Sequence, residues 1–112
     1  MAGWYDLKTA KDGQTFFVLK AGNGETILKS EMYKAKASAE NGIASVQKNS
    51  PDDNRYEKKV ATNGQFHFNL KAGNHEIIGS SELYTTEAAR DNGIESVKTN
   101  GPSTTIKDNT GG

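Results

Sequence analysis

The chain contains one module twice, and this internal repeat limits its fold more than any other feature of the sequence. When the chain is shifted by about 51 residues, it matches itself without an insertion, and about half of the compared positions are identical. The best-matching segments are residues 19–23 with 70–74, 30–33 with 81–84, and 41–43 with 92–94. A solenoid needs three or more repeats, so two copies predict a closed pair related by a pseudo-twofold axis.

Each copy is too small to fold well by itself. A domain of roughly 50 residues leaves much of its surface in water and buries only a marginal core. The full chain of 112 residues has the size of one ordinary domain. We therefore predict one compact domain over residues 1–112, a monomer with an internal pseudo-dimer. Its expected parts are repeat 1 (3–53), repeat 2 (54–103), a terminal strand (104–108) and a disordered tail (109–112).

Local signals predict three strands and a helix in each copy. The pairs Asp12-Gly13 and Asn63-Gly64 tolerate positive φ angles and predict a tight type I′ hairpin turn after the first strand. The sequence then favours a second strand, a third strand through Ile27 or Ile78, and a helix. The expected ranges are 5–8, 15–20 and 36–48 in copy one, and 56–59, 66–71 and 87–99 in copy two.

Periodicity predicts which faces of these elements are buried. Strand alternation puts Phe17 and Leu19 on one face of the second strand, which we expect to be the core face. Ala39, Ile43 and Val46 recur at helical spacing and form one apolar stripe facing a sheet. The fold class is therefore α+β, with two helices packed on one mainly antiparallel sheet. The terminal strand repeats the start of a module, so we expect it to pair into this sheet.

Capping signals differ between the two helices. Thr85 or Thr86 can cap the second helix, whereas the matching Lys34 and Ala35 offer no side-chain cap.

Composition argues against several partners. The chain carries 14 basic and 14 acidic residues, and its only arginines are Arg55 and Arg90. Binding to a phosphate backbone usually needs a basic excess, so nucleic acid is not the expected partner. The absence of cysteine excludes thiol chemistry and fits a reducing compartment. The chain has neither a signal-peptide pattern nor an apolar run long enough to cross a bilayer, so we expect a cytoplasmic protein away from membranes.

Candidate metal and cofactor motifs fail on their spacing. His67 and His75 occur only in copy two, and the sequence places no cysteine or paired histidine with them. Residues 22–24 lack the remainder of a phosphate loop, and the acidic residues 52–53 lack the other ligands of a calcium loop. We therefore expect neither a metal site nor a cofactor.

Polar residues shared by both copies have two interpretations. They shape either the fold or a ligand site, and we favour the fold. A glycine in the middle of a helix costs about 1 kcal/mol against alanine, so a close approach to the sheet should offset it. The shared pairs are Ser30/Ser81, Glu31/Glu82, Tyr33/Tyr84, Asn41/Asn92, Gly42/Gly93, Ser45/Ser96 and Asn49/Asn100.

Both copies resemble the YegP-like family, small bacterial proteins classed as a domain of unknown function. The resemblance is carried by residues 4–5, 17–23, 30–33 and 39–43, and by their counterparts in copy two. It covers residues 3 to about 108 and implies a β3-α-β arrangement. In that arrangement two modules join into one sheet and exchange their last strands. The resemblance implies no activity, cofactor or catalytic residue. His67, Asn69 and Gly79 depart from the matching Phe16, Val18 and Leu28.

Three functions remain open. We favour a small soluble structural or protein-interaction module without catalytic activity, whose protein partner the sequence does not identify. The alternative is binding of a small ligand or single-stranded nucleic acid on the open sheet face, where rings stack on bases and lysines meet phosphates. An unrecognised enzyme is disfavoured because no nucleophile motif is present. The candidate contact residues are Phe16, Lys20, Phe66, His67 and Lys71.

Overall fold

Each repeat consists of three strands followed by a helix, as the sequence predicts. The computed structural model describes residues 3–110. In chain order the elements are β1 (Trp4–Thr9), β2 (Thr15–Lys20), β3 (Thr26–Ser30), α1 (Lys36–Asn49), the 3-10 turn η1 (Asp53–Arg55), β4 (Tyr56–Val60), β5 (Phe66–Lys71), β6 (Ile77–Ser80), α2 (Glu87–Asn100) and β7 (Ile106–Asn109).

All seven strands form one sheet in the order β4-β5-β6-β3-β2-β1-β7. The strands of repeat 2 stand in mirrored order to those of repeat 1, with β3 and β6 paired antiparallel at the centre. A pseudo-twofold axis therefore passes between β3 and β6. Only β7 breaks the antiparallel pattern, because it pairs parallel to β1. The predicted α+β fold, with two helices on one mainly antiparallel sheet, is confirmed.

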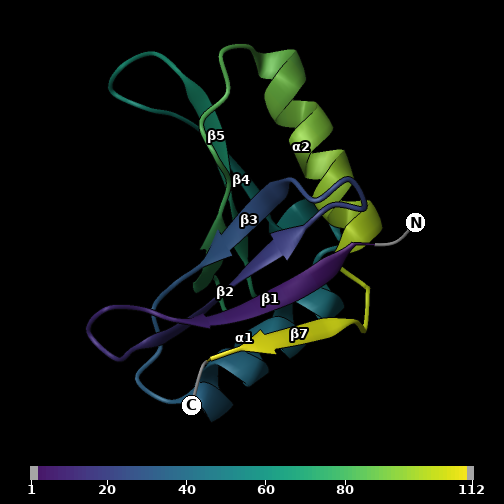
Figure 1. Ribbon diagram of the computed structural model, residues 1–112. Coiled ribbons are helices and arrows are strands. Elements are labelled where there is room, and N and C mark those ends of the chain that lie inside the picture. The colour runs from purple at the N-terminus through teal and green to yellow at the C-terminus, as the bar shows by residue number, and fades with distance from the viewer. Residues whose placement is uncertain (1–2, 111–112) are drawn as a thin grey trace.

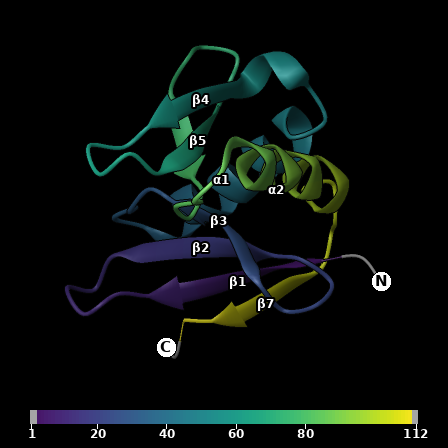
Figure 2. The ribbon, with the colours of Figure 1, turned by 90° about the horizontal axis from the view of Figure 1, so that it is seen from above.

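Both helices lie on the same side of the sheet, and the sheet curves around them (Figures 1 and 2). Helix α1 packs on β2 of its own repeat and on β5 and β6 of the other. Helix α2 packs on β5 of its own repeat and on β2 and β3 of the other. Each helix thus covers apolar surface that belongs to both repeats, and one core serves the whole chain.

The buried core follows the predicted strand alternation. Tyr5 and Leu7 of β1 face the helices together with Phe17 and Leu19 of β2. In repeat 2, Phe68 and Leu70 are likewise buried and Tyr56 is partly buried, whereas Lys58 takes the place of Leu7. A bulge in β3 and another in β6 change the register next to β2 and β5. The core cluster consists of Tyr5, Leu7, Phe17, Leu19, Ile27, Leu28, Ala39, Ile43, Val46, Phe68, Leu70, Ile78, Ile94 and Val97.

The terminal strand pairs into the sheet, but its position corrects the predicted boundaries. Strand β7 spans Ile106–Asn109 rather than 104–108, so Asn109 belongs to the strand and not to a tail. Of the rest of the predicted tail, Thr110 accepts a hydrogen bond from Thr9 Oγ1 at 2.9 Å, and residues 111–112 lie outside the described residues. Strand β7 follows α2 of repeat 2 and pairs with β1 of repeat 1. A reciprocal exchange of terminal strands between the two repeats is not shown, because β4 pairs with β5.

The hairpin turns also differ in type from the prediction. A type I′ turn needs positive φ at both central residues, but here only Gly13 and Gly64 adopt it, at 86° and 84°. Ala10 donates its N–H to Gln14 O, and Gly13 donates its N–H to Ala10 O. This pattern is a three-residue loop in which the glycine forms a bulge. Asp12 Oδ1 accepts a bond from Gln14 N at 3.0 Å, which stabilises a non-positive φ at the aspartate.

The predicted difference in helix capping is confirmed. Thr86 accepts a hydrogen bond from Ala89 N at 3.1 Å at the start of α2, whereas Ala35 at the start of α1 forms no side-chain cap. Within residues 3–110, neither helix has the length and hydropathy that a membrane crossing requires.

Candidate functional site

Four of the five predicted contact residues lie on the open face of the sheet, opposite the helices. Strand alternation places Phe16 and Lys20 on the face opposite buried Phe17 and Leu19, and it places His67 and Lys71 likewise in β5. Phe66 differs, because it lies on the helix face in line with Phe68 and Leu70. Arg90 of α2 stacks over the Phe66 ring at 5.5 Å from the centroid. The structure therefore does not join Phe66 to the other four residues.

The open face is rich in lysine. One cross-strand row runs through all seven strands, from Glu57 in β4 to Lys107 in β7. The complete row is Glu57, Asn69, Ser80, Lys29, Val18, Asp6 and Lys107. Two of the cations stack on aromatic rings, with Lys107 over Trp4 at 4.3 Å and Lys29 over Phe16 at 5.4 Å. Long lysine side chains thus cover the rings, as amphipathic stems commonly do.

The two copies differ on this face at one buried position, and the side chains around that position differ as well. Val18 in repeat 1 is replaced by Asn69 in repeat 2, and both side chains are buried despite the absence of a helix above them. Asn69 accepts a bond from Ser80 Oγ at 2.7 Å and donates one to Glu57 Oε1 at 3.2 Å. The polar replacement is therefore satisfied, and it does not by itself indicate a ligand.

The two histidines lie apart in the fold. His67 lies in β5 on the open face, and His75 lies in the turn before β6 with a φ of 70°. Among residues 3–110, no group of three histidine, aspartate or glutamate side chains gathers in a way that could hold a metal ion.

The shared serines and tyrosines make structural contacts. Ser30 Oγ accepts a bond from Phe17 N at 2.9 Å and donates one to Glu31 O, and Ser81 makes the same pair of bonds in repeat 2. A Cβ at Gly42 would stand only 2.5 Å from the hydroxyl of Tyr33. Gly93 has the same relation to Tyr84. The mid-helix glycines thus admit a tyrosine between helix and sheet.

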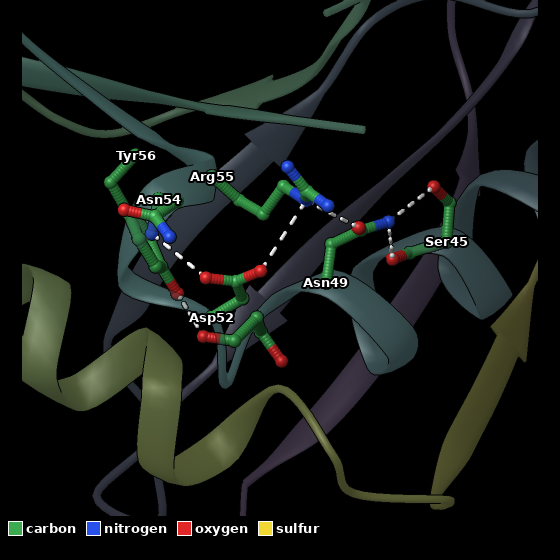
Figure 3. Close-up of polar contacts among 7 residues, drawn as sticks. Ser45, Asn49, Asp52, Asn54, Arg55 and Tyr56 are labelled. Carbon is green, nitrogen blue, oxygen red and sulfur yellow. Dashed lines mark hydrogen bonds and ion pairs between the residues drawn. The ribbon is translucent and has the colours of Figure 1, made fainter. Parts of the chain in front are cut away.

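The shared Asn49 holds the connection from α1 into β4, as Figure 3 shows. Its amide donates to Ser45 O at 2.8 Å, and its oxygen accepts from Arg55 Nε at 3.2 Å. Tyr56 donates its hydroxyl to Ser50 O at 2.6 Å. In repeat 2, Asn100 makes the same bond to Ser96 O, while its oxygen accepts from Gly3 N. These contacts fix where each first strand begins.

Asn41 and Asn92 belong to the shared set but make no such contact within residues 3–110. Both are exposed on the helices, and within the described residues their amides form no hydrogen bond to the strands. Asn41 lines a hollow of about 250 Å³ with Gly42, Ser45 and Asn74.

The outer side of β4 is the clearest open feature of the molecule. The pseudo-twofold axis relates β1 to β4, but β1 is covered by β7, whereas β4 ends the sheet within residues 3–110. Tyr5 N donates to Thr105 O, so the odd-numbered amides of β1 point outward. By the same alternation, Lys58 and Val60 point their amides away from β5. We call this outer side of β4 the open edge.

A hollow of about 450 Å³ lies beside the open edge, between β4 and α2. It is lined by Asp53, Tyr56, Lys58, Asp91, Ile94 and Glu95. Lys58 Nζ pairs with Asp91 Oδ1 at 3.3 Å, and Lys98 Nζ pairs with Asp53 Oδ1 at 2.5 Å and with Glu95 Oε2 at 3.2 Å. Three carboxylates and one ammonium thus line the hollow itself.

The charges around the hollow shift several pKa values. A hydrogen bond from Lys58 lowers the pKa of the Asp91 carboxyl below its usual value. Hydrogen bonds to Asp53 and Glu95 raise the pKa of Lys98. Burial raises the pKa of Tyr56, which therefore stays a neutral hydroxyl that donates to Ser50 O. Asp91 and Glu95 of α2 thus lie beside the open edge, each in an ion pair with a lysine.

Strand periodicity does not reveal the open edge, although the sequence contains a signal for it. The chain contains three segments that start a module, which become β1, β4 and β7, but only two modules. With three such segments, β7 covers β1, but no fourth segment remains among the described residues to cover β4.

Comparisons with known proteins agree with the duplication. A family model described as a domain of unknown function, DUF1508, matches residues 10–57 and again 61–108. Each match runs from the second strand of a repeat into the next first strand, so its boundaries differ from our predicted 3–53 and 54–103. The family unit therefore ends in a strand, which is β4 in the first unit and β7 in the second.

The relatives cover nearly the whole chain. A UPF0339 protein of Acinetobacter baylyi is 68% identical over 99% of this chain and 100% of its own length. The UPF0339 protein YegP of Escherichia coli K12 is 64% identical over 98% of this chain and 100% of its own length.

Two solved structures have the same fold. The solution NMR structure of yegP from E. coli, a protein of unknown function, superposes with a TM-score of 0.95 at 64% identity and covers 100% of this chain and 97% of its own. The solution NMR structure of a UPF0339 protein from Shewanella oneidensis gives a TM-score of 0.91 at 60% identity, covering 96% and 92%. None of these matches shows catalysis or a specific function. The chain is therefore a tandem-repeat member of the YegP-like DUF1508 family.

Proposed function

We propose that the chain is a non-catalytic protein-interaction module that binds an extended segment of a partner protein along the open edge of β4. One observation carries this proposal: β7 covers β1, whereas the equivalent edge at β4 is open among the described residues. An unpaired strand edge offers a row of backbone N–H and C=O groups, and adding a strand to such an edge is a common mode of peptide recognition.

The side chains on β4 protect the edge from unselective pairing. Glu57, Lys58 and Lys59 follow one another on a strand of only five residues, and charged side chains on short edge strands oppose aggregation. Lys58 replaces Leu7 of the matching strand β1, and Leu7 is buried in the core. The open edge therefore carries a charge where β1 carries an apolar side chain. This charge favours pairing with a specific partner over unselective pairing with other exposed strands.

The proposal also covers the oligomeric state, the cellular compartment and a non-catalytic role. We propose a monomer in the cytoplasm, supported by helices that already cover the apolar surface of both repeats and by a sequence free of cysteine. A non-catalytic role is supported by the shared serines, tyrosines and terminal asparagines, whose polar groups are used in contacts within the fold.

A proline substitution in the open edge tests the proposal. Lys58→Pro removes an outward amide at an edge position that tolerates proline, whereas Lys58→Ala removes the same side chain and keeps the amide. In affinity capture from native lysate at physiological salt, a partner bound through the edge is retained by Lys58→Ala and lost by Lys58→Pro. Equal retention by both variants, or no reproducible partner of the wild type, contradicts the proposal.

The open sheet face supports a second candidate function, which is binding of a small anionic ligand or of single-stranded nucleic acid. Strand alternation and register place six lysines there against two acids, and Trp4 and Phe16 offer ring faces. The lysines are Lys8, Lys20, Lys29, Lys59, Lys71 and Lys107, and the acids are Asp6 and Glu57. NMR titration with an oligonucleotide should shift β2 amides and the Trp4 indole; unchanged spectra at millimolar ligand contradict this candidate.

A further inference from the structure

We infer that the repeat 1 half of the open sheet face binds single-stranded nucleic acid, with one base stacked on Trp4 and another on Phe16. This inference rests on the second candidate function, which it makes more specific, and it does not depend on the open edge of β4. It follows from where the lysines and the aromatic rings of this face lie. We call the surface formed by Trp4, Phe16, Lys20, Lys29 and Lys107 the ring patch.

The positive charge that has no acidic partner lies on one half of the face. In the repeat 2 half, Lys59 and Lys71 both pair with Glu57, at 3.7 and 2.9 Å. In the repeat 1 half, Lys8 pairs with Asp6 at 3.6 Å. Within residues 3–110, the three lysines of the ring patch pair with no carboxylate. The ring patch is therefore cationic, although the whole chain has no net charge.

Both rings of the ring patch lie next to its lysines. Lys20 stands directly opposite Trp4 in the β1–β2 pair, and Lys107 of β7 lies over the indole ring at 4.3 Å. Lys29 of β3 lies over the Phe16 ring at 5.4 Å. Trp4 and Phe16 are half-buried, so part of each residue is in contact with solvent. A base on either ring would thus have an ammonium group beside its phosphate.

Repeat 2 offers no equivalent of the ring patch. The offset that aligns the repeats places Arg55 at the position of Trp4 and His67 at the position of Phe16. Arg55 is bonded instead to Asn49 Oδ1 at the end of α1. Among the described residues no strand covers β4, so repeat 2 also lacks a counterpart of Lys107. The terminal strand β7 therefore completes a binding surface that only repeat 1 has.

The spacing of the two rings fits an extended single strand. Phe16 stands opposite Lys8, which is four residues along β1 from Trp4. At about 3.4 Å per residue, the rings are about 14 Å apart along the strands. Stacked bases of one nucleic-acid strand are about 3.4 Å apart, so the two rings take bases that are not stacked on each other. Such bases are available in a single strand, whereas a duplex keeps its bases stacked.

A bound base replaces the lysine that covers each ring. An exposed cation–π contact contributes a factor of about two to five to an equilibrium constant. Stacking of a base on an aromatic side chain contributes about five- to 150-fold. The flexible lysine stem lets the displaced ammonium turn to a phosphate beside the ring. The exchange therefore favours a ligand that has both an aromatic face and a negative charge, and a simple anion has only the second.

Two matched ligands test the inference on the full chain by NMR. The first is single-stranded hexathymidylate, and the second is an abasic strand with the same phosphodiester backbone. Hexathymidylate should shift the Trp4 indole and the amides of Phe16, Lys20 and Lys107, with a Kd of about 0.1 mM at low salt. The abasic strand should bind about tenfold more weakly or less, because it cannot stack.

Ring variants identify the residues that hold the bases. Trp4→Leu and Phe16→Leu each remove a ring and keep an apolar side chain. Each should weaken hexathymidylate binding by about tenfold and leave binding of the abasic strand unchanged, which separates lost stacking from a damaged fold. The control His67→Leu, at the position equivalent to Phe16, should alter neither ligand.

Charge variants identify the lysines that meet the phosphates. With three lysines engaged, the logarithm of the binding constant should fall against the logarithm of the salt concentration with a slope of about −2. The double variant Lys20→Gln/Lys107→Gln should reduce this slope by about one. The control Lys59→Gln/Lys71→Gln changes the net charge equally, but it removes lysines that pair with Glu57, and should leave the slope unchanged.

The outcomes separate the inference from the function on which it rests. Equal binding of both ligands at the ring patch overturns the stacking of bases but leaves an anionic ligand on the open face in place. An equal loss of binding in the two double charge variants overturns the placement of the site in repeat 1. If millimolar hexathymidylate shifts no resonance of the open face, the second candidate function fails together with the inference.

Discussion

Leu28 occupies space that Gly79, its counterpart in the other repeat, leaves empty. A Cβ at Gly79 would lie 3.1 Å from Leu28 Cγ and 2.8 Å from Lys29 O. Both residues stand beside the β3–β6 pair, where equivalent positions of the two repeats meet. Ser50 and Gly101 repeat this relation at the ends of the helices, because a Cβ at Gly101 would overlap Ser50 Oγ. Near the pseudo-axis, one copy therefore carries a side chain where the other has glycine.

The first prediction concerns this pair. Gly79→Ala should lower the free energy of unfolding by about 1–3 kcal/mol, because the added methyl group overpacks a well-filled site. Urea unfolding measures the change. In a Leu28→Ala background the same substitution should cost less, with a coupling energy above about 0.5 kcal/mol. Some cost should remain because Lys29 O does not move with the side chain. Additive effects of the two substitutions would show that Leu28 does not fill the space at Gly79.

The second prediction uses the unequal helix caps. Thr86→Ala removes the cap of α2 and should cost about 1 kcal/mol, whereas Ala35→Thr adds the missing cap to α1 and should stabilise the chain by up to a similar amount. Chemical denaturation measures both changes. Ala35→Val adds comparable bulk without an acceptor and is the control. If valine stabilises the chain as much as threonine does, the gain comes from packing and not from capping.

The third prediction concerns the turn before β6. His75 adopts a φ of 70°, where the matching Gly24 adopts 87°. The left-handed conformation costs a residue with a side chain roughly 1–2 kcal/mol, so His75→Gly should stabilise the chain despite the added freedom of the unfolded state. Gly24→His should destabilise it by a comparable amount. Thermal melts of the two variants measure these opposite shifts; a shift of the same sign in both would contradict strain as the cause.

The fourth prediction is the release of β7 in acid. Hydrogen bonds from Lys36 and Thr110 lower the pKa of Asp108 from 3.8 to about 2. A folded pKa below the unfolded one contributes stability that is present above about pH 4 and lost as the pH falls through about 2. Amide exchange in β7 should therefore accelerate over that range before the rest of the sheet opens. Hydrogen exchange followed by NMR measures this local change.

Two variants isolate the carboxyl group responsible. Asp108→Asn should make β7 exchange faster at neutral pH and abolish its acid dependence below pH 4. Asp91→Asn removes a carboxyl group whose pKa is also lowered, but on α2, and should leave the acid dependence of β7 unchanged. If Asp91→Asn alters β7 as Asp108→Asn does, the acid response belongs to the whole molecule.

The fifth prediction is that neither half of the chain folds alone. Helix α1 rests partly on β5 and β6, and α2 rests partly on β2 and β3. A fragment of residues 1–54 should therefore lack a cooperative melt in circular dichroism, and mixing it with residues 55–112 should restore one. A fragment 1–54 that melts cooperatively as a monomer would show that repeat 1 buries its own core.

Periodicity and the repeat together predicted most of the fold. Strands β2 and β5 and the starts of both helices lie where the alternation of Phe17 with Leu19 and the stripe of Ile43 and Val46 predict them. These features are local, and a similar pattern occurs at the equivalent positions of both repeats. The hairpin turns were predicted with the wrong type, because Asp12 and Asn63 are tolerated at positive φ but do not adopt it here.

The candidate site was less accessible to sequence reasoning. The alternation predicted that Phe16, Lys20, His67 and Lys71 share a face. Phe66 lies on the opposite face of β5 and stacks beneath Arg90. The open edge depends on which strand lies beside which other, and strand order is set by contacts between distant residues. No local pattern in Tyr56–Val60 distinguishes an edge strand from the covered β1 except the charge of Lys58.

The parallel β1–β7 pair has a consequence for how quickly the native state can be reached. Tyr5 donates its hydroxyl to Gly101 O across a separation of 96 residues, immediately before the strand that pairs beside it. Contacts between residues so far apart in the chain carry a large entropic cost of loop closure, and they slow folding. During synthesis, β1 emerges from the ribosome before both helices and gains β7 as its neighbour only after both repeats have been made. Pairing of these two strands is therefore a late step of folding.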